Sequence, residues 1–202
     1  MIKAVLTDLD GVVRKWDPEI IQQAEAAAGL PRDALPSTAF EPDLLLRAIT
    51  GRISDAGWRT EVAERLRLRF PDADAAEAVR LWSLSPGEID TDVLDLLRQC
   101  RECASLVLIT NATTRLESDL KRLGISRTFD HIVNSSSIGH AKPHPGIFYA
   151  ALDLLSVKPG EALFIDDKIG NVDAATGIGI HGYHYATLDG LKCELESYIL
   201  PG

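Results

Sequence analysis

Cysteine, positive charge and long hydrophobic runs are all scarce in this 202-residue chain. Its three cysteines cannot form the disulfide framework of a small secreted domain, and the pair Cys100-x-x-Cys103 has no second pair or histidine cluster at zinc spacing. No apolar run approaches the roughly 20 residues of a membrane span. The N-terminal residues include Asp8 and Asp10 and are too acidic for a signal peptide. We therefore expect a cytoplasmic protein without a membrane partner.

The chain is acidic, with 21 basic residues, 30 acidic residues and a formal net charge of −9. Nucleic-acid binding needs a basic face, so we expect no nucleic-acid partner. A small phosphate ester is not excluded, because a bound cation reverses the local field. The hydrophobic fraction of 46% and the charged fraction of 25% are those of an ordinary globular domain, and the length suits one core domain with a modest insertion. The sequence indicates no particular oligomeric state.

Short apolar runs alternate with amphipathic helical patterns along most of the chain. The runs predict buried strands at residues 2–6, 106–109, 131–133 and 162–165, with a weaker fifth strand within 178–185. Apolar residues recur at helical spacing over residues 93–100, 116–123 and 148–155. Strands that alternate with helices of this length indicate an α/β fold, in which a parallel sheet is connected by right-handed crossovers.

A long segment without a convincing strand separates the first predicted strand from the second. It carries helical stripes at residues 20–28, 44–49, 58–70 and 75–82, which end at glycine or proline signals. We interpret residues 15–85 as a small all-helical lid, joined by two linkers to a core formed by residues 1–14 and 86–202. The alternative is that these helices simply pack on the sheet.

Polar residues stand where the strongest predicted strands end or where a helix begins. In chain order these are Asp8 and Asp10, Thr110 and Asn111, Lys142, and Asp166 and Asp167. Ligands of open α/β sheets bind at the carboxyl ends of the strands, so we expect these side chains to converge there. Most of them also have a simpler explanation. Thr110-Asn111 could be a helix N-cap, Lys142 a solvated loop lysine, and Asp166-Asp167 a capped strand end. Paired acids after large apolar residues are costly, however, unless a cation neutralises them.

The order and spacing of these residues resemble the four sequence motifs of the haloacid dehalogenase-like superfamily, and the resemblance covers the whole chain. The four matching segments are Thr7-Asp8-Leu9-Asp10-Gly11-Val12, Leu108-Ile109-Thr110-Asn111, Lys142-Pro143-His144-Pro145-Gly146-Ile147-Phe148, and Phe164-Ile165-Asp166-Asp167 with Asn171. The resemblance implies a Rossmann-like parallel sheet sandwiched by helices, with a small all-helical cap of the C1 type inserted after the first strand. Two positions depart from the family pattern. His144 stands where an Asp is frequent, and Asn171-Val172 replaces the common Asn-Asp.

By this resemblance, Asp8 is the nucleophile that forms an aspartyl-phosphate, and Asp10 is the general acid and base. The implied cofactor is Mg²⁺, a hard cation that prefers oxygen ligands. Its expected ligands are a carboxylate oxygen of Asp8, the backbone carbonyl of Asp10, and Asp167, with Asp166 contributing directly or through water. The expected partner is a small phosphorylated metabolite, hydrolysed by a phosphatase.

The resemblance also assigns the binding of the phosphoryl group to Thr110, the backbone N–H of Asn111, and Lys142. Specificity is expected to come from the cap. There, Arg52 lies between two predicted helices and is a candidate contact for an anionic substrate, although a solvated arginine is the simpler interpretation.

Asp10 favours phosphate ester hydrolysis over dehalogenation, because a departing halide needs no proton. A phosphomutase of the same superfamily is an alternative, since it uses the same four motifs. A 2-haloacid dehalogenase and a non-catalytic binding protein are weaker alternatives. The identity of the substrate cannot be derived from motifs that serve many metabolites.

Overall fold

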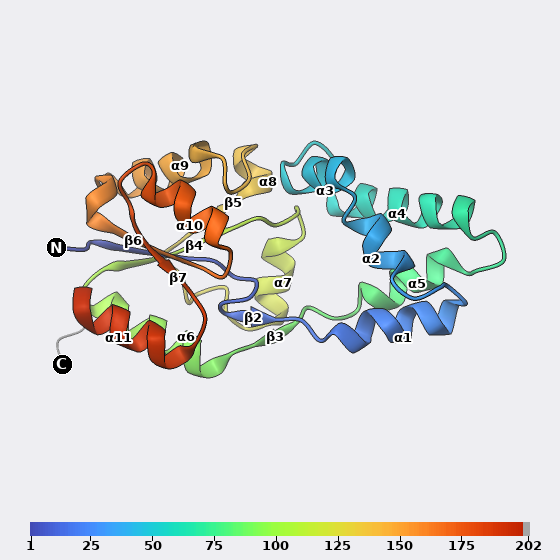
Figure 1. Ribbon diagram of the computed structural model, residues 1–202, viewed down its shortest axis with the longest axis horizontal. Coiled ribbons are helices and arrows are strands. Elements are labelled where there is room, and N and C mark those ends of the chain that lie inside the picture. Colours follow the sequence, from blue (N-terminus) through green and yellow to red (C-terminus); the bar gives the residue numbers. More distant parts are fainter. Residues whose placement is uncertain (200–202) are drawn as a thin grey trace.

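A five-stranded parallel sheet forms the centre of the computed structural model, which describes residues 1–199 (Figure 1). Its strand order is β5-β4-β1-β6-β7, from β1 (Ala4–Thr7), β4 (Ser105–Thr110), β5 (His131–Asn134), β6 (Ala162–Asp166) and β7 (His181–His184). The predicted α/β fold with a Rossmann-like parallel sheet is confirmed. From the central β1 the chain builds β4 and β5 on one side and then crosses to β6 and β7 on the other. This reversal opens a crevice at the carboxyl ends of the central strands.

Helices cover both faces of the sheet. One face packs on α9 (Pro145–Leu155) and α10 (Ile169–Thr176), and the other on α6 (Thr91–Gln99), α7 (Leu116–Arg122) and α11 (Leu188–Tyr198) (Figure 1). Successive strand residues face opposite sides: Val5 belongs to the cluster around α6, and Leu6 to the cluster around α9. Because both faces are buried, the strands have continuous apolar runs and not an alternating pattern. Three short helices complete the core: α8 (Ser135–Ile138), η1 (Cys100–Glu102) and η2 (Pro159–Glu161).

Five helices lie between two short strands and extend to one side of the sheet (Figure 1). They are α1 (Pro18–Ala28), α2 (Ala34–Ala39), α3 (Pro42–Ile49), α4 (Asp55–Arg69) and α5 (Ala75–Trp82), and we call residues 18–82 the helical insertion. Its apolar stripes form a hydrophobic cluster of their own, separate from the two clusters of the sheet. This supports the proposed division into a core and an all-helical cap, whose boundaries stay a prediction.

The two connections to the helical insertion pair with each other. The sequence predicts linkers here, but β2 (Arg14–Lys15) and β3 (Glu88–Ile89) form a two-stranded antiparallel sheet. Two residues per strand are too few to leave a periodic pattern in the sequence, and the pairing joins segments far apart in the chain. The paired strands fix where the chain leaves the core and where it returns.

The helical insertion also contacts the core directly where α3 connects to α4, next to α8 (Figure 1). The Thr113 hydroxyl donates to Asp55 Oδ1 (2.8 Å), and the Asp55 backbone N–H donates to the Thr114 hydroxyl (2.9 Å). Gly51, at φ +72°, lies so close to the core that a Cβ there would come within 2.1 Å of the Ser136 carbonyl oxygen. These contacts hold the insertion against the carboxyl edge of the sheet. No helix among residues 1–199 has the length and hydrophobicity to cross a membrane.

Candidate active site

The three central strands end side by side, and each ends at a polar residue of the predicted site. Thr110 is the last residue of β4, Asp166 is the last residue of β6, and Asp8 directly follows β1. The Asp8 backbone N–H continues the ladder by donating to the Ile165 carbonyl (2.9 Å). The apolar strands therefore bring three residues that are far apart in the sequence to one edge of the sheet.

Lys142 lies between two of these acids. Its Nζ is 2.8 Å from Asp8 Oδ1 and 2.7 Å from Asp166 Oδ2, and it also donates to the Ile109 carbonyl (3.0 Å). Only 5% of Lys142 is exposed, so the alternative of a solvated loop lysine is wrong. A buried ammonium group with two carboxylate partners provides a fixed positive charge at the end of β1.

The Asn111 side chain holds Lys142 in place. Its amide Nδ2 donates to the Lys142 carbonyl (2.8 Å), and its Oδ1 accepts from the Lys142 backbone N–H (2.7 Å). An amide side chain offers the donor and the acceptor on neighbouring atoms, which matches the N–H and C=O of one backbone residue. The sequence suggests a role for the backbone N–H of Asn111 and not for its side chain, because this pairing depends on a loop 31 residues further along the chain.

Asp166 is held by an equally complete set of donors. Oδ1 accepts from the backbone N–H of Lys168 (2.8 Å), and Asn171 Nδ2 lies 3.1 and 3.0 Å from the two carboxylate oxygens. Together with Lys142, these donors commit both oxygens of this fully buried carboxylate to protein partners. Asn171 therefore orients Asp166, a role that its position after the fourth motif did not by itself reveal.

Asp167 lies beside these acids and has an uncommitted oxygen. Carboxylate oxygens of Asp8, Asp166 and Asp167 all lie within 4.8 Å of one another. Among the described residues, Asp167 Oδ1 is buried without a hydrogen-bond partner. Gly11 makes room for this carboxylate, since a Cβ there would lie 2.3 Å from Asp167 Oδ2. Three carboxylates with an unsatisfied oxygen form a donor set that fits a hard divalent cation such as Mg²⁺.

The electrostatics of the acidic cluster also favour a cation. Burial raises the pKa of Asp8 to about 6, with Lys142 lowering it and Asp166 raising it further. Burial and the neighbouring charge of Asp166 raise the pKa of Asp167 as well. One lysine therefore does not neutralise three acids, and an additional positive charge would favour their ionised forms.

The Thr110 hydroxyl is the second unsatisfied group at this edge. Only 1% of Thr110 is exposed, and its Oγ1 has no hydrogen-bond partner within residues 1–199. A buried hydroxyl without a partner is unfavourable and needs an explanation. The position fits a hydroxyl that donates to an oxygen of a bound ligand, next to the ammonium group of Lys142.

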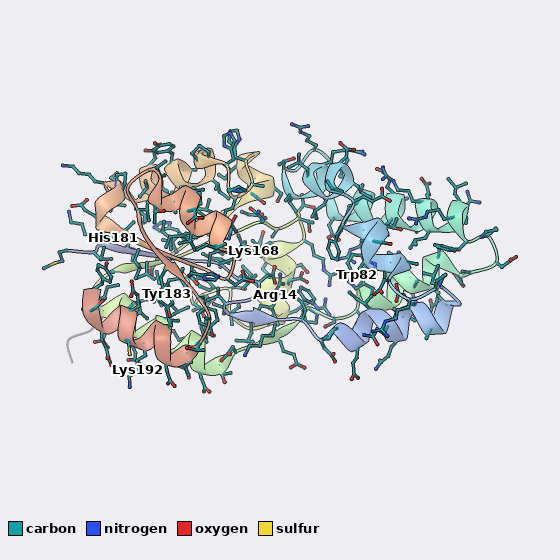
Figure 2. All side chains as sticks on the ribbon, viewed as in Figure 1. Arg14, Trp82, Lys168, His181, Tyr183 and Lys192 are labelled. Atoms are coloured by element: carbon teal, nitrogen blue, oxygen red, sulfur yellow. The ribbon has the colours of Figure 1, made fainter. Side chains whose placement is uncertain are left out.

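Asp10 is separate from the acidic cluster and faces two donors of the first connection. The Arg14 guanidinium group donates to both carboxylate oxygens of Asp10, with Nε 2.7 Å from Oδ1 and Nη2 2.9 Å from Oδ2. The Trp16 indole N–H also donates to Oδ1 (2.7 Å). Arg14 is buried and lies at the junction between the sheet and the helical insertion (Figure 2). The sequence places Arg14 and Trp16 only on a linker, so it did not predict that they orient Asp10.

Two other positions singled out in the sequence are Arg52 and His144. Arg52 is exposed and does not line the cavity between the helical insertion and the sheet, whereas Arg59 does. His144, where the family often has Asp, caps α9 by accepting from the Gly146 N–H (3.0 Å). This departure from the motif therefore leaves the cap of α9 and the position of Lys142 intact.

Comparison with known proteins indicates the family to which the chain belongs. A family profile described as haloacid dehalogenase-like hydrolase matches residues 2–179. A haloacid dehalogenase-like hydrolase domain-containing protein 3 from Xenopus laevis is 36% identical over 104 residues; the match covers 50% of this chain and spans only 41% of that protein. A phosphoglycolate phosphatase from Pseudomonas putida is 30% identical over 206 residues, which cover 96% of this chain and 74% of the relative.

A solved structure shares nearly the whole fold. A HAD family enzyme from Bacteroides thetaiotaomicron, crystallised with magnesium and inorganic phosphate, superposes with a TM-score of 0.74 at 27% identity. The superposition covers 92% of this chain and 95% of that one. The chain therefore belongs to the haloacid dehalogenase-like hydrolases, a family of enzymes.

Proposed function

We propose that this enzyme is a magnesium-dependent phosphatase, which hydrolyses a small phosphorylated metabolite through an aspartyl-phosphate on Asp8. The observation that carries the proposal is the buried ammonium group of Lys142 beside the Asp8 carboxylate (2.8 Å), next to the unpartnered hydroxyl of Thr110. A nucleophile, a fixed positive charge and a free donor thus meet at one strand end. This is what the transfer of a phosphoryl group to a carboxylate requires.

Two acids divide the chemistry. In the first step, an Asp8 carboxylate oxygen bonds to phosphorus while the bond from phosphorus to the leaving oxygen breaks, and Asp10 gives that oxygen its proton. In the second step, water attacks the aspartyl-phosphate and gives its proton to Asp10, which releases inorganic phosphate and restores both carboxyl groups. The Arg14 and Trp16 donors keep Asp10 in one orientation for both proton transfers.

Lys142, Thr110 and the backbone N–H of Asn111 stabilise the charge on the transferring phosphoryl oxygens. The Asn111 amide fixes the backbone of Lys142, so the ammonium group needs little reorganisation when substrate binds.

Asp8, Asp167 and the backbone carbonyl of Asp10 would hold the Mg²⁺ ion. Asp166 would contact it through water, because both its oxygens already accept hydrogen bonds. The ion supplies positive charge that lets two anions, carboxylate and phosphate, approach each other. Magnesium and phosphate in the crystallised Bacteroides relative support this assignment.

Dehalogenation is disfavoured by Asp10. A halide leaves without a proton, so a dehalogenase has no use for an acid held two residues after its nucleophile. No feature of the cavity favours a mutase over a hydrolase, and we propose hydrolysis because phosphatases are among the relatives.

The test is the release of inorganic phosphate from p-nitrophenyl phosphate by the full chain. We expect release with Mg²⁺, none after chelation, and loss of activity in Asp8→Asn. The matched control is Asp72→Asn, which changes an exposed aspartate of the helical insertion and is expected to keep full activity. Equal release by Asp8→Asn and the wild type would refute the proposal, and isomerisation of a sugar phosphate without free phosphate would indicate a mutase.

A further inference from the structure

A cavity of about 390 Å³ lies between the helical insertion and the carboxyl edge of the sheet. Asp10 and Asn111 belong to its lining, so the cavity is continuous with the candidate active site. Its volume is within the range of sites for small organic molecules. A phosphoryl group bound at Lys142 would leave only its ester substituent to fill this space. The chemical character of the cavity lining therefore indicates which kind of substituent fits.

The wall on the side of the helical insertion is aromatic and aliphatic. Trp58 and Trp82 pack edge to face with ring centroids 5.3 Å apart. The ring centroid of Phe40 lies 6.4 Å from that of Trp58 and 6.3 Å from that of Trp82. Trp16 lines the cavity from the first connection, so all three tryptophans of the chain face it. Four aliphatic side chains extend the same surface: Ile20, Ile21, Leu45 and Ile49. A wall of this kind favours an apolar, preferably aromatic, group.

The charges in the cavity are already paired. Three arginines line it, and each has an aspartate partner that also lines it: Arg14 with Asp10 (2.7 Å), Arg59 with Asp55 (2.7 Å) and Arg115 with Asp119 (2.8 Å). The remaining acid of the lining, Asp17, caps α1 by accepting from the Glu19 N–H (2.8 Å). Arg14 Nη1 also lies 3.8 Å from Asp119 Oδ2, so this arginine keeps a carboxylate neighbour when Asp10 carries the catalytic proton. Among the described residues of the lining, no cation is left over for a second anionic group. A carboxylate in this space would be desolvated without a partner, which is strongly unfavourable.

Arg59 is the cation that stacks on Trp58 and Trp82, and its surroundings leave it little capacity for a ligand. Its guanidinium group lies over Trp82 (4.7 Å to the ring centroid) and Trp58 (5.5 Å), donates to Asp55, and donates to the Ser83 hydroxyl (2.5 Å). Figure 2 shows Trp82 on the insertion side of the junction that Arg14 marks.

We propose that this cavity binds the leaving group of the substrate, and that the leaving group is an uncharged aromatic or bulky apolar alcohol. The preferred substrate is then a phosphate monoester without a second anionic group. It differs in this respect from phosphoglycolate, the substrate named for the Pseudomonas relatives. The proposal rests on the phosphatase function proposed above, and its test separates the two.

The first arm of the test measures binding without turnover. Because every tryptophan of the chain lines the cavity, tryptophan fluorescence reports its occupancy directly. We expect a saturable change with benzyl alcohol, which is the uncharged product of benzyl phosphate, and none with glycolate. No saturable change with benzyl alcohol, or binding of glycolate alone, would overturn the cavity assignment whatever the catalytic result.

The second arm compares kcat/KM for benzyl phosphate and phosphoglycolate, which both release an alcohol. We expect benzyl phosphate to be preferred by roughly 100-fold. In Trp82→Ala this ratio is expected to fall by about tenfold or more, while Leu68→Ala, which truncates an exposed residue outside the cavity, keeps it. Equal or better use of phosphoglycolate by the wild type would contradict the proposal. Release of phosphate from neither ester would count against the phosphatase function, and the binding arm would still decide the cavity assignment.

A gain-of-function variant tests whether the paired arginines exclude anionic leaving groups. Asp55→Asn removes the carboxylate that pairs with Arg59, while its amide oxygen can still accept from the Thr113 hydroxyl. We expect kcat/KM for phosphoglycolate to rise by about tenfold relative to benzyl phosphate, because Arg59 can then bind a substrate carboxylate. An unchanged ratio would contradict the inference that paired arginines exclude anionic leaving groups.

Discussion

Asp8→Asn is expected to abolish activity and, in the absence of metal, to make the folded protein more stable. The reason is the position of Asp8, which is 5% exposed and shares its surroundings with Asp166 and Asp167. Burial raises its pKa to about 6, compared with about 3.9 for an aspartate in an unfolded chain. The folded state therefore disfavours the ionised carboxylate that the unfolded state accepts freely.

The sign and the size of this change in folding stability follow from the linkage between protonation and folding. The penalty is fully present above pH 6, decreases as the pH falls through the folded pKa, and is absent below about pH 4. It amounts to about 3 kcal/mol at pH 7.5 and to about half of that at pH 5. Asparagine is neutral at every pH and keeps an oxygen that accepts from the Leu9 N–H, while Lys142 keeps its pair with Asp166. The free energy of unfolding of the variant should thus exceed that of the wild type by up to these amounts.

The assay is urea denaturation of the wild type and the variant in excess chelator at pH 5.0 and pH 7.5. Comparing two proteins at each pH cancels the titration of groups that do not interact with Asp8, and Asp72→Asn controls for the loss of an exposed charge. We expect the difference in free energy of unfolding between the variant and the wild type to be about twice as large at pH 7.5 as at pH 5.0. A variant that is less stable than the wild type at pH 7.5, or a difference that does not change with pH, would refute this account of Asp8. Added Mg²⁺ should stabilise the wild type more than the variant, because it binds the folded state through that carboxylate.

Three further substitutions test individual parts of the site. Lys142→Met leaves two buried carboxylates without their cation and should destabilise the metal-free protein by about 3–5 kcal/mol in urea denaturation; unchanged stability would contradict the buried pairing. Asp10→Asn should lower kcat by roughly 10²–10⁴ for alkyl phosphates and much less for p-nitrophenyl phosphate, whose leaving group needs no proton; equal losses would argue against Asp10 as the acid. Gly11→Ala should raise the Mg²⁺ concentration for half-maximal activity by about tenfold or more, because the new Cβ displaces Asp167. Gly29→Ala is its control, since that glycine has a similar positive φ but open space around it, and an equal effect of both would attribute the change to backbone strain.

The sheet and the residues at its edge could be predicted because one physical signal marks both. A strand buried on two faces is apolar throughout, so the first polar residue after it, such as Asp8 or Asp166, marks the carboxyl edge. The order of these residues along the chain then identifies the family. The position of Thr110 follows from the same logic, because it is the last residue of β4. Lys142 lies in the connection between α8 and α9, so its place beside Asp8 was expected from the resemblance to the family and not from a strand end.

What could not be predicted depends on contacts between distant segments or on the exact face of a helix. Asn111 and Asn171 orient Lys142 and Asp166 through side-chain amides, and nothing in a single sequence distinguishes such an amide from a helix cap. Arg14 is an ordinary linker arginine until the β2–β3 pairing fixes its backbone beside Asp10. Arg52 is the arginine that the sequence suggests for substrate contact, but Arg59, two turns further along, lines the cavity.

The central claim is that phosphate passes through a covalent bond to Asp8, and trapping that bond tests it most directly. The enzyme is mixed with Mg²⁺ and p-nitrophenyl phosphate, quenched in acid and reduced with borohydride, which converts an aspartyl-phosphate to homoserine. Mass spectrometry of the peptide that contains residues 4–10 then locates the modification. We predict homoserine at position 8, dependent on both substrate and Mg²⁺. Modification at Asp10 or elsewhere, or turnover that leaves position 8 unmodified, would contradict the account.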